Sequence, residues 1–134
     1  MPTEPLAVLQ EYFDLVQAFS VDTAAYAAVL HPEVEQLEYA NDLNKQPVSR
    51  SFDEILTNLR AGRELLLDPS FIVHHTHVGS TGTIVVEGRW EATVLHDAGP
   101  AVRGQRVASE LCLVFEFKDG KIYRQRRYPC YEPL

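Results

Sequence analysis

Cysteine is scarce in this sequence, and its scarcity excludes two kinds of site. The 134 residues contain two cysteines, Cys112 and Cys130, and neither belongs to a Cys-x-x-Cys pair. No pattern of cysteine and histidine supplies the four ligands of a structural zinc site. No disulfide framework is indicated either, so we expect both thiols to be reduced, as they are in the cytoplasm.

Positive charge is also sparse. The chain has 12 lysines and arginines against 19 aspartates and glutamates, which gives a formal net charge of -7. Basic residues are spread thinly except for Arg124, Arg126 and Arg127. A nucleic-acid surface needs a dense basic patch to neutralise phosphates, and an anionic membrane attracts basic segments. The sequence therefore predicts neither nucleic acid nor a membrane as a partner.

Long apolar runs are missing as well. No run approaches the ~20 residues of a membrane-spanning helix. The N-terminal stretch MPTEPLAVLQEYF lacks the basic start and apolar core of a signal peptide. With 46% hydrophobic and 23% charged residues, the composition is typical of a globular protein. We expect one domain over residues 1–134, located in the cytoplasm.

Apolar residues three and four positions apart predict helices in the first half of the chain. Thr3 is the expected N-cap of the first helix. Ser51 forms a capping box with Glu54 at the start of the third, and Asp68-Pro69 is expected to stop it. The first two expected helices cover residues 3–19 and 23–30, and the third runs from residue 51 to Asp68-Pro69.

Beyond Pro69 the apolar period changes from 3.6 to 2, which predicts strands. Asp119-Gly120 is typical of a tight hairpin turn, whereas the polar residues 41–48 predict a loop. Helices followed by antiparallel strands indicate an α+β domain. The expected strands cover residues 34–39, 71–78, 83–96, 106–117 and 121–131.

Three stretches carry a resemblance to a known family. They are LHPEVEQLEY from Leu30, VVEGRWEATV from Val85, and LVFEFKDGKIYRQRRYPCYEP from Leu113. With the order of the predicted elements, they resemble the nuclear-transport-factor-2-like superfamily, which includes SnoaL-like polyketide cyclases, ketosteroid isomerases and limonene-epoxide hydrolases. The resemblance implies a cone-shaped half-barrel, with three N-terminal helices packed on a strongly bent, mainly antiparallel sheet around a cavity. That fold serves isomerases, cyclases, hydratases and ligand binders, so it implies no single activity.

Glu38 is the first catalytic candidate. The isomerases place a proton-shuttling carboxylate near the end of the first strand, and Glu38 falls at about that place. Burial in an apolar pocket would raise its pKa and let it take a proton from carbon next to a carbonyl. The alternatives are a solvated strand end or an ion pair with an arginine. We expect Glu38 to share one strand face with Val34 and Gln36 and to turn into the cavity toward Tyr12, Trp90 and one of the histidines. Glu35 should face solvent, although Leu37 is the more apolar neighbour and competes with Glu38 for the inner position.

Tyr12 is the second catalytic candidate. The resemblance implies that a tyrosine of the first helix donates a hydrogen bond to developing enolate charge, and Tyr12 matches that position. The aspartate that accompanies it in the isomerases is replaced here by Leu113. The acid that many SnoaL-like proteins carry after Tyr128 is replaced by Pro129. Without these two acids, the isomerase and cyclase mechanisms of the family cannot be carried over directly to this chain. The alternative for Tyr12 is a structural role as a core residue.

Trp90 is expected to form a wall of the cavity. Period-two alternation places it opposite Glu87, Arg89 and Glu91, which resemble the Asp-Arg-Asp triad of the epoxide hydrolases only superficially. Both sets cannot line one cavity, and we favour Trp90. Gly88 is expected to bend or bulge the strand.

His75 and His77 project from one face of a strand and could supply two metal ligands, with Glu38 or Glu87 as a third. We instead expect no metal and interpret both as polar pocket lining or solvent-exposed residues. The remaining residues expected to bind ligand are Tyr39, Asn41, Leu113, Phe115 and Tyr128.

The sequence thus favours a small cavity protein that binds a hydrophobic, carbonyl-containing molecule. It would act as an isomerase or cyclase without a cofactor, through Glu38 as general base. The alternative is a ligand-binding or dimerisation module without turnover. Because Ala108, Cys112 and Val114 lie on the outer face of their strand, we also expect a homodimer through that face.

Overall fold

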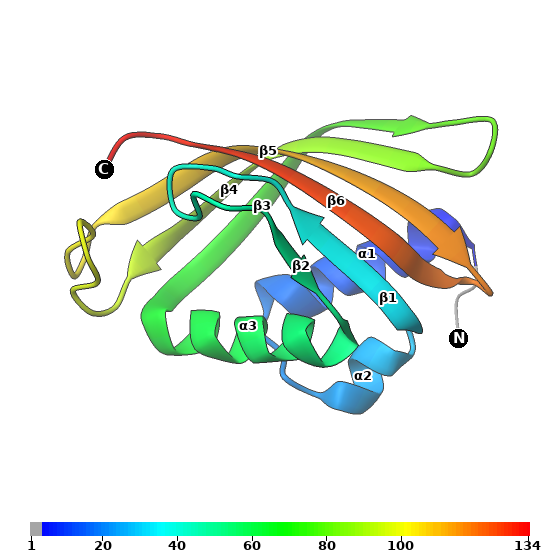
Figure 1. Cartoon of the computed structure of the whole chain (residues 1–134), viewed down its shortest axis with the longest axis horizontal. Helices are drawn as coiled ribbons and strands as arrows, with labels where there is room; N and C mark the ends of the chain where they lie inside the picture. The colour runs from blue at the N-terminus through cyan, green and yellow to red at the C-terminus, as the bar shows by residue number, and fades with distance from the viewer. Residues whose placement is uncertain (1–3) are drawn as a thin grey trace.

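The computed structural model of the protein describes residues 4–134. Within these residues three helices pack on one face of a curved six-stranded sheet (Figure 1). The helices are α1 (Pro5–Gln17), α2 (Thr23–Ala27) and α3 (Phe52–Leu65). The strands are β1 (Leu30–Glu38), β2 (Val48–Arg50), β3 (Leu66–Val78), β4 (Ile84–Val94), β5 (Arg106–Lys118) and β6 (Lys121–Tyr131).

The strand order is β2-β1-β6-β5-β4-β3. The pair β1–β6 is parallel, and every other neighbouring pair is antiparallel. The expected α+β cone with a mainly antiparallel sheet is therefore confirmed. No helix in the described part of the chain is long and apolar enough to cross a membrane.

Local signals set most of the element boundaries. The Ser51 hydroxyl accepts from the Glu54 amide and the Glu54 carboxylate accepts from the Ser51 amide, which confirms the capping box of α3. Asp119 and Gly120 both have positive φ, as the tight β5–β6 turn requires. The expected N-cap Thr3 lies outside the described residues, and the Glu4 carboxylate caps α1 instead.

Several expected boundaries are wrong, and the first strand already starts at Leu30 instead of Val34. Residues 48–50, expected within or beside a loop, form β2, which pairs with the last residues of β1. The second helix ends at Ala27, three residues early. The third helix ends at Leu65, and β3 starts at once and runs through Asp68-Pro69. The strand accommodates this pair by a register shift between Leu67 and Ser70, so the proline interrupts the pairing without ending the strand.

The core lies between α1 and the concave face of the sheet. On β5, Leu111, Leu113 and Phe115 are buried whereas Glu110 is exposed, as period-two alternation requires. Phe115 packs edge-on against Tyr12 and Phe13 of α1. This packing fixes the helix over the sheet and leaves space toward α3 for a cavity.

Candidate functional site

A cavity of about 370 Å³ lies between α1, α3 and the concave face of the sheet. Most of its wall is apolar, and one end is polar. The apolar wall includes Val16, Phe19, Ile55, Leu59, Leu65, Trp90 and Leu111. The polar end consists of Tyr12, Gln36, Glu38, Asn44, Arg50 and Arg127, which hydrogen bonds and ion pairs connect. A volume in this range suits a small organic ligand.

Glu38, the last residue of β1, faces this cavity as expected and is only 5% exposed. Gln36 is buried on the same face, whereas Glu35 is exposed. Leu37 does not take the inner position. Leu30, Val34, Gln36 and Glu38 are all buried, so the same alternate residues of β1 point inward along the whole strand.

Two arginines and two asparagines surround the Glu38 carboxylate. Arg50 Nη1 lies 3.2 Å and Arg127 Nε 3.5 Å from Oε1. The side-chain amides of Asn41 and Asn44 donate to Oε2 at 3.0 and 2.8 Å. β2 and β6 supply the two arginines from either side of β1, and the loop after β1 supplies the two asparagines.

These donors reverse the expected effect of burial on Glu38. Desolvation by itself raises the pKa of the carboxyl, but the Arg127 charge, the two amide hydrogen bonds and the Arg50 charge together hold the pKa below its usual value. The expectation of a raised pKa is therefore wrong. Glu38 is ionised at neutral pH, and the alternative of an ion pair with an arginine describes its state.

A chain of hydrogen bonds continues from Arg50 into the core. Arg50 Nη1 donates to Gln36 Oε1 at 2.9 Å, and Gln36 Nε2 donates to Gln125 Oε1 at 2.9 Å. The Tyr12 hydroxyl donates to the same oxygen at 3.2 Å. Burial raises the pKa of Tyr12, so its phenol stays protonated. Tyr12 therefore reaches the polar end of the cavity and donates to Gln125.

A side pocket of about 60 Å³ adjoins the cavity and shares Tyr12, Trp90 and Arg127 with it. Trp90 thus faces inward as expected. Arg89 lies on the other face, where it pairs with Glu91, Glu110 and Glu132. Leu113 contributes to the side pocket. Phe115 is fully buried in the core and lines neither space.

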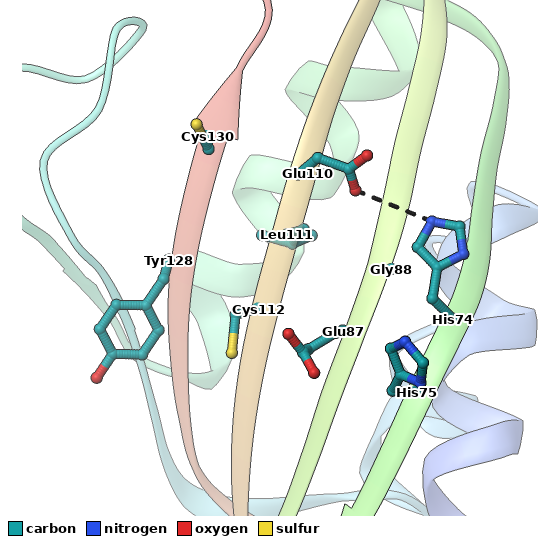
Figure 2. Close-up of a pocket in the computed structure, with 9 residues that line it drawn as sticks. All are labelled: His74, His75, Glu87, Gly88, Glu110, Leu111, Cys112, Tyr128 and Cys130. Atoms are coloured by element: carbon teal, nitrogen blue, oxygen red, sulfur yellow. Dashed lines mark ion pairs between the residues drawn. The ribbon is translucent and has the colours of Figure 1, made fainter.

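The histidines do not reach the cavity, so the expectation that Glu38 faces one of them is wrong. His75 borders a groove on the outer face of the sheet (Figure 2). His77 is exposed, and its Nε2 lies 3.4 Å from Glu87 Oε1. A metal site joining them to Glu38 is impossible because the sheet separates the groups. Within residues 4–134 no three His, Cys, Asp or Glu side chains lie close enough to bind a metal.

Two other predicted residues also lie outside the cavity. Tyr39 and Tyr128 stack with ring centroids 4.7 Å apart, and both are exposed. Tyr128 borders the outer groove. Asn41 contributes indirectly, because its amide orients the Glu38 carboxylate.

The sequence reasoning missed the basic and amide residues of the polar end. Gln125 and Arg127 alternate with Arg126 and Tyr128 along β6, so period-two spacing could have grouped them with Pro129 on one face. Arg50 offered no such signal, because it ends a strand of three residues. Gln36 was correctly placed on the face of Glu38, but its role was not foreseen.

The SnoaL-like domain model matches residues 9–125. The chain belongs to the SnoaL-like family. No curated protein matches it significantly. Three solved structures have a similar fold but share 22% sequence identity or less with this chain. At this level of identity the similarity establishes the fold and not the function.

An NTF2-like protein from Burkholderia thailandensis has a TM-score of 0.70 at 22% identity, over 94% of this chain and 90% of that one. IdmH, a candidate polyketide cyclase from Streptomyces antibioticus, has a TM-score of 0.76 at 9% identity, over 94% and 91%. An LEH-like epoxide hydrolase from M. tuberculosis has a TM-score of 0.66 at 21% identity, over 96% and 84%.

Proposed function

We propose that this SnoaL-like protein binds a small, hydrophobic, carbonyl-containing molecule in its cavity. The observation that carries the proposal is the division of one space into an apolar wall and a single polar end. Such a space holds an apolar body by burial and orients one polar group by hydrogen bonds. The names of two proteins of similar fold, a candidate polyketide cyclase and an LEH-like epoxide hydrolase, are consistent with a small organic ligand.

Binding is tested by calorimetric titration with 5-phenylpentan-2-one, a flexible aromatic ketone. Trp90 is the single tryptophan of the chain and lines the cavity, so its fluorescence is a second readout of occupancy. Gly62→Leu should abolish binding by filling the cavity, because a β-carbon there meets only the Phe19 ring, at 3.6 Å. Thr57→Leu adds an apolar side chain on the exposed side of α3 and should leave binding unchanged.

A second candidate function is catalysis with Glu38 as general base, without a cofactor. Its support is that an ionised carboxylate borders the cavity beside Arg127. The carboxylate would take a proton from carbon next to the ligand carbonyl, and the C–H electron pair would move to the carbonyl oxygen as an enolate. The proton would return at another carbon in an isomerisation. The lowered pKa of Glu38 makes it a weak base, so this reaction requires an acidic carbon such as that of a 1,3-dicarbonyl.

Proton abstraction predicts that Glu38→Gln lowers the rate of deuterium incorporation at that carbon by about 100-fold or more. Glutamine keeps the size and the acceptor oxygen but cannot accept the proton. The measurement is proton NMR of 1-phenylbutane-1,3-dione in deuterated buffer, with the uncatalysed exchange subtracted. Exchange that is equally fast with Glu38→Gln, or no faster with the wild-type protein than in buffer, would leave only the binding function.

We also propose that two copies associate through the outer face of the sheet. This face carries a groove of about 430 Å³, bordered in Figure 2 by two histidines, two carboxylates, both cysteines and Tyr128. The supporting observation is that apolar side chains accompany these polar ones. Ile72 and Tyr128 are exposed, while Cys112 and Val114 are half-buried. An exposed sheet face of this mixed composition is typical of an interface.

Sedimentation equilibrium should therefore give a dimer at concentrations of tens of micromolar, an order of magnitude suited to interfaces of modest size. Val114→Lys should give a monomer, because it places a second positive charge opposite Arg126 within the interface. Thr81→Lys adds the same charge in the exposed β3–β4 turn and should remain dimeric. A monomeric wild-type protein at these concentrations would contradict the proposal.

A further inference from the structure

The polar end of the cavity carries an excess of positive charge. Of the residues in the described chain that line the main cavity, only Glu38, Arg50 and Arg127 are charged. Two guanidinium groups against one carboxylate leave one positive charge uncompensated, in a protein whose formal net charge is -7. Arg50 is nearly buried and the Arg127 side chain is one quarter exposed. A partly desolvated excess cation is costly unless a counter-ion accompanies it.

Gln125 adds an unpaired donor beside this charge. Arginine can only donate, so the Gln36 atom that faces Arg50 must be the carbonyl oxygen. Gln36 must then present its NH₂ group to Gln125, whose oxygen also accepts from Tyr12. Because the Gln125 oxygen accepts these two hydrogen bonds, the Nε2 atom of Gln125 takes no part in this hydrogen-bond network. It is buried, in a residue 1% exposed, and has no partner among the described residues.

Arg127 presents a second unpaired donor from the same face of β6, two residues further on. Its Nε is buried and makes no hydrogen bond within residues 4–134, although Glu38 Oε1 lies 3.5 Å away. Gln125 and Arg127 both line the side pocket, whose other walls include Phe13, Phe71 and Leu113. Two donors in an apolar pocket with one surplus positive charge match an acceptor group that carries one negative charge.

We propose that the ligand is a hydrophobic monocarboxylate. Its carboxylate occupies the side pocket and accepts from Gln125 Nε2 and Arg127 Nε, while its apolar body lies in the main cavity against Trp90. The inference rests on the proposed binding function. It specifies that the carbonyl group of the ligand belongs to a carboxylate. A pocket of about 60 Å³ has room for a carboxylate, and one surplus charge favours a monoanion over a dianion.

The test compares two ligands that differ in one group. Calorimetric titration at pH 7.5 uses 4-phenylbutanoate and 5-phenylpentan-2-one, in which a methyl ketone replaces the carboxylate. The carboxylate should bind at least about tenfold more tightly, as expected for hydrogen bonds to a charged group. Arg127→Met should remove that preference. Arg126→Met, which removes the same charge from the outer face, should change either affinity less than about twofold.

Arg127→Lys provides a variant that keeps the charge beside Glu38 but lacks Nε, and it should retain only part of the preference. Equal or tighter binding of the ketone by the wild-type protein would overturn the inference while the proposed function stands. Undiminished preference in a folded Arg127→Met protein would overturn it as well. If neither compound binds, both the inference and the proposed function are wrong for this class of ligand.

Discussion

Replacing Arg50 by methionine is expected to lower the free energy of unfolding by about 3 kcal/mol, because it removes the buried hydrogen bonds to Gln36 and Glu38 and leaves polar atoms without a donor. Arg50 Nη1 contacts both Gln36 Oε1 and Glu38 Oε1, and the side chain is 10% exposed. Methionine fills the volume of the aliphatic stem but donates no hydrogen bond. The loss leaves the Gln36 oxygen unsatisfied and Glu38 with Arg127 as its remaining cationic partner.

Arg126→Met is the matched control for urea unfolding of the Arg50 variant. It removes an arginine that pairs with Glu116 on the partly exposed outer face, where an ion pair contributes at most about 1 kcal/mol. The double variant Glu38→Gln, Arg50→Met should be more stable than the sum of the two single effects predicts. A loss in Arg50→Met no larger than in Arg126→Met would show that the buried network does not stabilise the fold.

The pH dependence of stability gives a second readout of the same network. The folded-state pKa of Glu38 lies below its ordinary value of 4.5 despite the opposing effect of burial. The stability that its ionisation contributes is therefore fully present above pH 4.5 and is lost as the pH falls through the lower, folded-state pKa. The difference between the wild-type protein and Arg50→Met should shrink in that acidic range, because a protonated Glu38 no longer needs a counter-charge.

Gly88→Ala is expected to destabilise the protein by about 3 kcal/mol through steric overlap with a neighbouring strand. A β-carbon at Gly88 would lie 2.5 Å from the Ile72 carbonyl oxygen and 2.7 and 2.8 Å from two ring atoms of Phe71. The oxygen belongs to the backbone of β3, and the residues before and after Ile72 in this strand are both paired with β4. Relief therefore requires the strand itself to move.

Gly62→Ala is the control for this substitution, and urea midpoints of both variants make the comparison. A β-carbon at Gly62 meets only the Phe19 ring at 3.6 Å, and alanine favours the helix, so the variant should be at least as stable as the wild-type protein. Because the Phe71 ring lines the side pocket, Gly88→Ala should also weaken ligand binding. A loss below about 1 kcal/mol in Gly88→Ala would mean that β3 yields easily here.

Local chemistry in the sequence determined the elements and most of their faces. The capping pair Ser51 and Glu54 located the start of α3, and Asp119-Gly120 located the β5–β6 turn. Alternation placed Trp90 inside and Arg89 outside. Side chains alternate between the two faces of a strand, so burial of one face fixes which residues point inward. These features depend on neighbours in the chain, so sequence reasoning reached them.

Only the tertiary structure decided the electrostatics of the site. Glu38 gains Arg50 from a strand of three residues and Arg127 from the parallel pairing of β1 with β6, some ninety residues apart in sequence. The direction of the Glu38 pKa shift depends on whether those charges outweigh desolvation, which spacing along the chain cannot reveal. The same holds for the histidines of β3. Their shared face was readable from the sequence, but the curvature and packing of the sheet decided that this face lies away from the cavity.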